Sequence, residues 1–106
     1  MTDRVSVLQA LADPTRQRIV ELLAVRDRSA GELAERFEVS RPAVSRHLRV
    51  LREAGLVTSR TSARHRIYRL EPATLEEVSD WLERTRRAWD ARLDALEEEL
   101  RRRPER

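Results

Sequence analysis

The sequence contains no cysteine, and this absence excludes several kinds of chemistry at once. Disulfide bonds, thiolate metal sites, cysteine nucleophiles and thiol redox switches are all ruled out. Glycine is nearly as scarce, with two residues in 106, so we expect no glycine-rich loop of the kind that cradles phosphate groups. The two histidines stand apart from any nucleophile or ligand partner. We therefore expect no catalytic site, no metal and no other cofactor.

Long apolar runs are also missing. No stretch approaches the roughly eighteen apolar residues that a membrane span requires, and the N-terminal residues do not combine a basic stretch with an apolar run. We expect neither a membrane partner nor a signal peptide, and hence a cytoplasmic location. The 106 residues are 40% hydrophobic and 39% charged, which is typical of one compact domain.

Charge is distributed unevenly along the chain. Residues 1–70 hold 14 arginines against 8 acidic residues, a net charge of +6, whereas residues 71–106 hold 8 arginines against 11 acidic residues, a net charge of −3. Residues 40–69 are the extreme case, with eight arginines and one acidic residue, Glu53. A local field of that sign attracts polyanions, of which the phosphate backbone of nucleic acid is the obvious candidate.

Capping signals predict the starts of three helices in the first half of the chain, and the spacing of apolar residues predicts one more, short helix before them. Asp13 followed by Pro14 is typical of a helix start, the segment from Ser29 to Glu32 has the form of a capping box, and Ser40 is a good N-cap. The predicted helices cover residues 3–11, 14–24, 30–37 and 41–54. The last two, joined by a short turn at residues 38–40, form a helix-turn-helix.

Two β-prone runs, at residues 56–61 and 66–70, follow the fourth helix and are separated by four small or basic residues. They predict a hairpin, which in this position is a wing. We expect Tyr68 and Leu70 to be buried and Ile67 to be open. The fold class is mainly α with a small β-hairpin, and residues 1–70 form a winged helix-turn-helix domain.

The fourth helix has one apolar and one polar face. At 100° per residue, Val44, Leu48 and Leu51 fall on the side that packs. The other side is offered outward, and an arginine fork on a helix in a major groove can grip guanine or a phosphate. The candidate DNA-binding residues are Arg41, Pro42, Ser45, Arg46 and Arg49 on the helix and Arg60, Arg64 and Arg66 in the hairpin. The hairpin arginines either reach a minor groove or contact the backbone only.

The remaining segment, residues 71–106, predicts one long helix from about residue 73 to 102, with apolar residues spaced by threes, fours and sevens. At about 1.5 Å per residue it extends on the order of 40 Å, longer than a small domain can cover. We expect its stripe to form the interface of a homodimer, with Trp81 and Trp89 as anchors. The alternative is that the two tryptophans cap the monomer core. The predicted interface residues are Leu82, Trp89, Leu93, Leu96 and Leu100.

Five segments in order resemble the ArsR/SmtB family of bacterial winged helix-turn-helix repressors. They are LADPTR at residues 11–16, GELA at 31–34, SRPAVSRHL at 40–48, LREAGLV at 51–57 and YRL at 68–70. The resemblance implies a homodimer that places its recognition helices in successive major grooves of double-stranded DNA. It also implies an imperfect palindrome at or near the protein's own promoter, where bound protein blocks the polymerase.

The sequence departs from this family where metal-sensing members bind their effectors. Those members use cysteines on the helix before the recognition helix, or histidine with acidic residues on the C-terminal helix. Here residues 31–37 contain no cysteine and the C-terminal helix contains no histidine. The chain therefore resembles the non-metal-sensing branch, in which the effector, if any, is a small molecule or a protein. The alternative function is a winged-helix protein-interaction or anti-repressor module without sequence-specific DNA binding, which has no need of Arg46 and Arg49 on its outer face.

Overall fold

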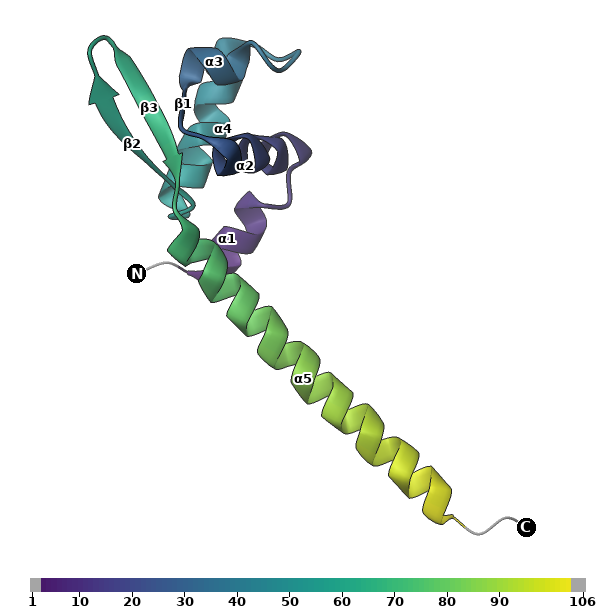
Figure 1. Cartoon of the computed structure of the whole chain (residues 1–106). Coiled ribbons are helices and arrows are strands. Elements are labelled where there is room, and N and C mark those ends of the chain that lie inside the picture. The colour runs from purple at the N-terminus through teal and green to yellow at the C-terminus, as the bar shows by residue number, and fades with distance from the viewer. Residues whose placement is uncertain (1–2, 104–106) are drawn as a thin grey trace. The chain divides into compact units, whose positions relative to one another are not determined.

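The computed structural model describes residues 3–103 and has the predicted architecture, mainly helical with one hairpin (Figure 1). The elements in chain order are α1 (Arg4–Ala10), α2 (Pro14–Val25), β1 (Arg28–Ser29), α3 (Ala30–Ala34), α4 (Arg41–Glu53), β2 (Val57–Ser62), β3 (His65–Leu70) and α5 (Pro72–Arg102). The chain divides into two compact units, one up to Leu75 and the other from Glu76 onward.

The helix starts lie where the capping signals predict them. Side-chain oxygens of Asp13 and Ser40 accept hydrogen bonds from the backbone N–H three residues further on, at 3.0 and 3.2 Å. Ser29 and Glu32 form a complete capping box, in which each side chain accepts from the other residue's backbone N–H. Because these bonds satisfy N–H groups that have no partner within the helix, they fix where α2, α3 and α4 begin.

The predicted extent of the third helix is wrong. It ends at Ala34 and not at Phe37. The N–H groups of Arg36 and Phe37 donate to carbonyls three residues back, at 3.0 and 3.3 Å, which is the bonding of a tight turn. The connection from α3 to α4 is therefore longer than the predicted three residues.

The three strands form an antiparallel sheet in the order β1-β3-β2. The two-residue β1 is not predicted from the sequence, because so short a strand carries no periodic signal. Tyr68 is buried, as predicted, while Ile67 and Leu70 are both half-buried. The two-residue turn between β2 and β3 holds Ala63 at a φ of 54°, in the left-handed region that favours glycine.

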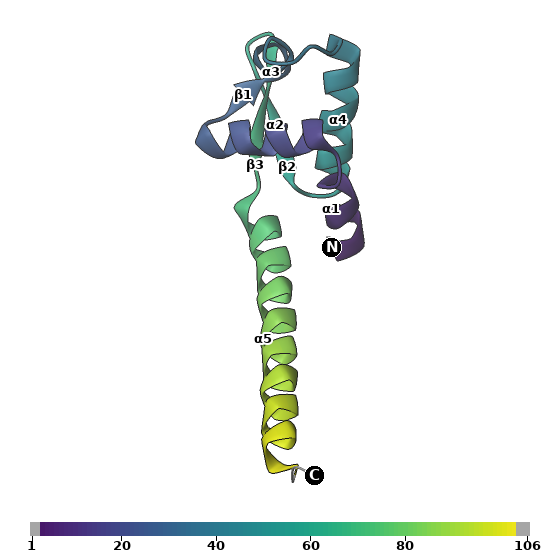
Figure 2. The same ribbon diagram turned by 90° about the vertical axis from the view of Figure 1, so that its right-hand side faces the viewer.

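The core of the first unit comes from every helix in it. The least exposed side chains belong to Ile19, Leu33, Val44, Leu48, Leu51 and Leu56, all at 0% exposure. Helix α2 packs against β3 and α4, and α4 also packs against α3, β2 and α1 (Figures 1 and 2). Helix α4 thus has one side fixed by four neighbours, namely α1, α2, α3 and β2, and its other side is open.

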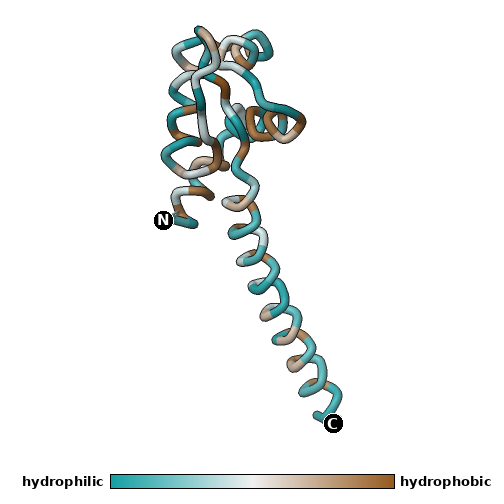
Figure 3. The backbone as a smooth tube through the Cα atoms, turned by 60° about the vertical axis from the view of Figure 1, so that its left-hand side comes forward, coloured by the Kyte–Doolittle hydropathy of each residue, from teal (hydrophilic) through white to brown (hydrophobic). Residues whose placement is uncertain are grey.

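Helix α5 is 31 residues long, and hydrophobic positions recur at intervals along an otherwise hydrophilic helix (Figure 3). Ion pairs three or four residues apart run along it, including Arg86 with Glu83 at 2.7 Å and with Asp90 at 3.1 Å. Pairs at this spacing favour the helical conformation. Among residues 3–103, no helix is both long and apolar enough to cross a membrane.

Candidate nucleic-acid interface

The exposed face of α4 presents the predicted polar residues. Val44, Leu48 and Leu51 are fully buried, whereas Ser45 and Arg46 on the opposite side are exposed. Ser40 caps the helix, and Pro42 lies in its first turn, where the missing proline N–H leaves no helical hydrogen bond unmade. The cap, the proline and the buried stripe together fix the axial rotation of α4 and therefore which residues face outward.

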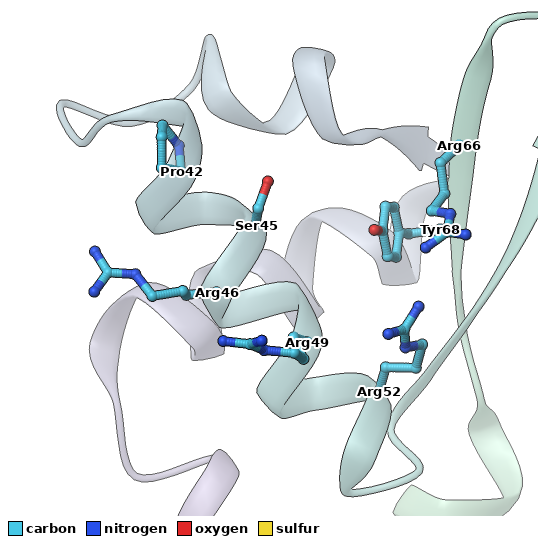
Figure 4. Close-up of a pocket in the computed structure, with 7 residues that line it drawn as sticks. All are labelled: Pro42, Ser45, Arg46, Arg49, Arg52, Arg66 and Tyr68. Carbon is cyan, nitrogen blue, oxygen red and sulfur yellow. The ribbon is translucent and has the colours of Figure 1, made fainter.

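A hollow of about 440 Å³ lies between α4 and β3 (Figure 4). We call it the α4–β3 hollow. Its lining residues are Pro42, Ser45, Arg46, Arg49, Arg52, Arg66 and Tyr68. Five of the eight predicted DNA-binding residues therefore come together at one place, from two elements that are separate in the sequence.

Two lining residues were missed by reasoning from the sequence. Arg52 lies three residues after Arg49 and seven after Ser45, so the helical spacing that selected those two also points to Arg52. Tyr68 is predicted only as a core residue. Strand alternation places it on the same face of β3 as Arg66, but it does not indicate that the hydroxyl faces the hollow, as Figure 4 shows.

The strand register explains why Arg66 joins the hollow and Arg60 does not. In the β2–β3 ladder Thr61 pairs with Arg66, and Arg60 pairs with Ile67. Because side chains alternate between the two faces of a sheet, Arg60 and Arg66 lie on opposite faces of the hairpin. Arg60 instead donates a hydrogen bond to Asp27 at 3.0 Å.

The other two predicted residues lie at the margins of this region. Arg64 is exposed in the turn between β2 and β3. Arg41, at the first position of α4, extends over Gly31 of α3, with its Nη2 atom 3.5 Å from where a Cβ atom of that glycine would be. The structure thus places both on the same chain segments as the hollow, without adding them to its lining.

The arginines of the hollow have no anionic partner. Within residues 3–103, Arg46, Arg49, Arg52 and Arg66 make no ion pair, and no acidic residue lines the hollow. On α5, by contrast, arginines are paired with neighbouring carboxylates. Like charges gathered without counter-charges repel one another, and a bound polyanion removes that cost.

Arg16 links the N-terminal helices to α4. Its side chain donates to the carbonyls of Ala10 at 2.6 Å and Gln9 at 3.3 Å, and its Nη1 atom lies 3.3 Å from Nδ1 of His47 on α4. Asp13 accepts from the backbone N–H of Arg16. That hydrogen bond is the main cause that lowers the pKa of Asp13, and the nearby charges of His47 and Arg16 act in the same direction against desolvation.

His47 therefore takes part in packing α4 rather than in a cluster of ligands. Among the residues that the structure describes, no group of three or more histidine, aspartate or glutamate side chains is arranged to hold a metal ion. The arrangement that does exist is a cationic, donor-rich surface built on one helix and one hairpin, of a size and charge suited to a nucleic-acid backbone.

Comparisons with known proteins agree with this geometry. The model of the family described as bacterial regulatory protein, arsR family, matches residues 13–59. The HTH-type transcriptional regulator Rv2034 of Mycobacterium tuberculosis is 50% identical over 76 residues, covering 72% of this chain and 71% of that protein. The transcriptional repressor SdpR of Bacillus subtilis is 34% identical over 77 residues, covering 73% and 86%.

Among solved structures, an ArsR-like transcriptional regulator from Rhodococcus sp. RHA1 is 41% identical, with a TM-score of 0.81 over 90% of each chain. HlyU from Vibrio cholerae is 36% identical, with a TM-score of 0.63, covering 80% of this chain and 89% of its own. The similarity thus extends over the winged helix-turn-helix in both sequence and structure.

Proposed function

The chain belongs to the ArsR family of bacterial DNA-binding transcriptional regulators, which are not enzymes, and we propose that it acts as a homodimeric repressor on a palindromic operator near its own promoter. In this proposal α4 is the recognition helix and the β2–β3 hairpin is the wing. Bound in the cytoplasm to double-stranded DNA, the dimer occludes the polymerase.

The observation that carries the proposal is the unpaired set of arginines around the α4–β3 hollow. A major groove about 12 Å wide admits one helix, and an arginine fork matches both guanine and phosphate acceptors. Arg60, which already has a carboxylate partner, lies on the other face of the hairpin. The arginines that line the hollow, none of which makes an ion pair within residues 3–103, therefore gather at one place, and a protein-interaction module has no need of that cluster.

We assign different tasks to the arginines by their position. Arg46 and Arg49 project from the middle of α4 and are the candidates for base edges, with Ser45 beside them. Arg41 and Arg64 lie at the helix start and the hairpin tip, where a duplex presents its backbone. Contacts of the first kind select a sequence, and contacts of the second kind hold the protein in register.

The homodimer is inferred from α5. Leu82, Trp89, Leu93, Leu96 and Leu100 recur at the spacing of a coiled-coil seam and are 40–57% exposed in the single chain. A stripe of that kind is covered most simply by a second copy of itself, since a two-fold axis brings identical faces together. The two recognition helices then meet half-sites about one turn of DNA, roughly 34 Å, apart.

Two substitutions test the assignment of base and backbone contacts. Arg49→Ala is expected to weaken binding to the operator by about 1–3 kcal/mol and to weaken binding to a scrambled duplex less, because a base contact is lost. Arg64→Ala is expected to weaken both duplexes by the same factor. Fluorescence anisotropy with the two duplexes measures all four affinities, and equal losses for Arg49→Ala on both duplexes would exclude base reading.

A further inference from the structure

Tyr68 combines burial with an unused polar group. The residue is 8% exposed, and its ring extends from β3 toward α4, with the hydroxyl aimed into the α4–β3 hollow (Figure 4). Among residues 3–103, no side chain or backbone group forms a hydrogen bond with this hydroxyl. No solvent-shielded polar side-chain atom of the described residues lacks a hydrogen-bond partner, so this unbonded hydroxyl is open to the hollow and is not sealed in the core. It is therefore available to a ligand that enters the hollow between the arginines.

The groups beside Tyr68 define the chemistry of that ligand. Arg52 comes from the last turns of α4 and Arg66 from β3, and both guanidinium groups lie beside the tyrosine in Figure 4. Arginine offers only donors, and the phenol can donate as well. No carboxylate in the described chain pairs with either arginine or lines the hollow. A ligand that accepts hydrogen bonds on several oxygens and carries negative charge satisfies all three side chains.

We propose that Arg52, Arg66 and the hydroxyl of Tyr68 form a phosphate subsite. The identity of its occupant rests on the proposed function: in the complex with DNA, the subsite holds a phosphate of the DNA backbone. That phosphate has the same oxygen chemistry as free phosphate. The subsite joins α4 to β3 through one anion, so occupancy fixes the recognition helix relative to the hairpin. Because a phosphate contact carries no sequence information, the subsite positions the protein and Arg49 retains the base-reading task.

The chain offers a direct probe, since Tyr68 is its only tyrosine. Tyrosine labelled with ¹³C only at Cζ, the carbon that bears the hydroxyl, gives a single NMR signal from the full-length protein. On titration with inorganic phosphate we expect this signal to move along a saturable curve, whereas potassium chloride at matched ionic strength leaves it in place. Arg52→Ala is expected to abolish the response. Arg60→Ala, which removes an arginine from the opposite face of the hairpin, is the matched control and is expected to retain it.

DNA supplies the second arm of the experiment. The upstream duplex is expected to shift the Tyr68 signal in the wild type and not in Arg52→Ala. Tyr68→Phe, which keeps the ring and removes only the hydroxyl, is expected to lower affinity about tenfold on operator and scrambled duplexes alike. Circular dichroism of each variant confirms that the fold is kept.

The outcomes separate the subsite from the proposed function. A response to duplex alone assigns the occupant to the DNA backbone, and a response to both ligands that Arg52→Ala removes supports a general phosphate subsite. If the duplex binds and Tyr68 responds to neither ligand, the subsite is refuted while the function stands. If phosphate moves the signal and no duplex binds, the subsite stands and the function fails. A response that chloride reproduces, or that Arg52→Ala leaves intact, also refutes the subsite.

Discussion

Replacing Leu93 by aspartate is expected to dissociate the proposed dimer. Leu93 lies within the exposed stripe of α5 and is 40% exposed in the single chain. Full burial of a leucine contributes about 1.5–3 kcal/mol, so covering the exposed part of this side chain contributes about 1 kcal/mol. Two copies double that figure to about 2 kcal/mol per dimer. The substitution therefore weakens the dimer by at least roughly thirtyfold in Kd, and the desolvation of two carboxylates adds to the loss.

Sedimentation velocity over a concentration series measures this shift, and Ala91→Asp is the matched control. Ala91 is exposed, lies two residues before Leu93 and so projects about 200° away from it around the helix. Both variants introduce the same charge into the same turn of α5. We expect Leu93→Asp to sediment as a monomer at concentrations where Ala91→Asp and the wild type sediment as dimers.

The loss of the dimer has a consequence for DNA binding. A monomer engages one half-site, so operator affinity falls further than any single contact accounts for. If Leu93→Asp remains dimeric with the Kd of the wild type, or if Ala91→Asp dissociates equally, the α5 stripe is not the interface and the reasoning from its exposure fails.

Three further predictions concern the first unit. Asp13→Ala is expected to lower the free energy of unfolding by about 1 kcal/mol in denaturant titrations, because the cap of α2 is lost. Since folding lowers the pKa of Asp13, this difference is complete above its ordinary value of 3.8 and disappears as the pH falls through the lowered value; a constant difference down to pH 2 would contradict it. Ala63→Gly is expected to raise the free energy of unfolding by about 0.5–1 kcal/mol, because glycine adopts the left-handed backbone of this turn without strain. A lower melting temperature in the variant would contradict this prediction. Arg66→Ala is expected to lower the slope of log K for DNA binding against log salt by about 1 per chain, whereas Arg60→Ala leaves that slope unchanged. Equal effects of the two substitutions would mean that the face of the hairpin does not decide which arginine contacts phosphate.

The helix starts and the inward face of α4 could be predicted because their signals are local. A serine or aspartate before an apolar run supplies a cap whatever lies elsewhere in the chain, and Val44, Leu48 and Leu51 define the buried side of α4 by spacing alone. The same reasoning overextended α3, because Phe37 continues the apolar spacing after the backbone has turned.

Helical spacing points to Arg52, but the role of Tyr68 and the division of the hairpin arginines depend on pairing and packing between distant segments. The two residues of β1 are a strand only because β3 lies beside them. The register of β2 against β3 decides that Arg60 and Arg66 lie on opposite faces, and neither the composition nor the spacing of the hairpin fixes that register. The role of Tyr68 depends likewise on the packing of β3 against the rest of the unit, which the sequence alone does not reveal.

The measurement that tests the central claim most directly is the affinity of the full chain for duplex DNA from upstream of its own gene against a scrambled duplex, by fluorescence anisotropy over a salt series. We predict tighter binding to the upstream duplex and a steep decrease with salt, close to 0.9 in log K per log salt for each phosphate contacted. Equal, weak binding to both duplexes with little salt dependence would contradict the account, because the unpaired arginines of the α4–β3 hollow would then have another partner.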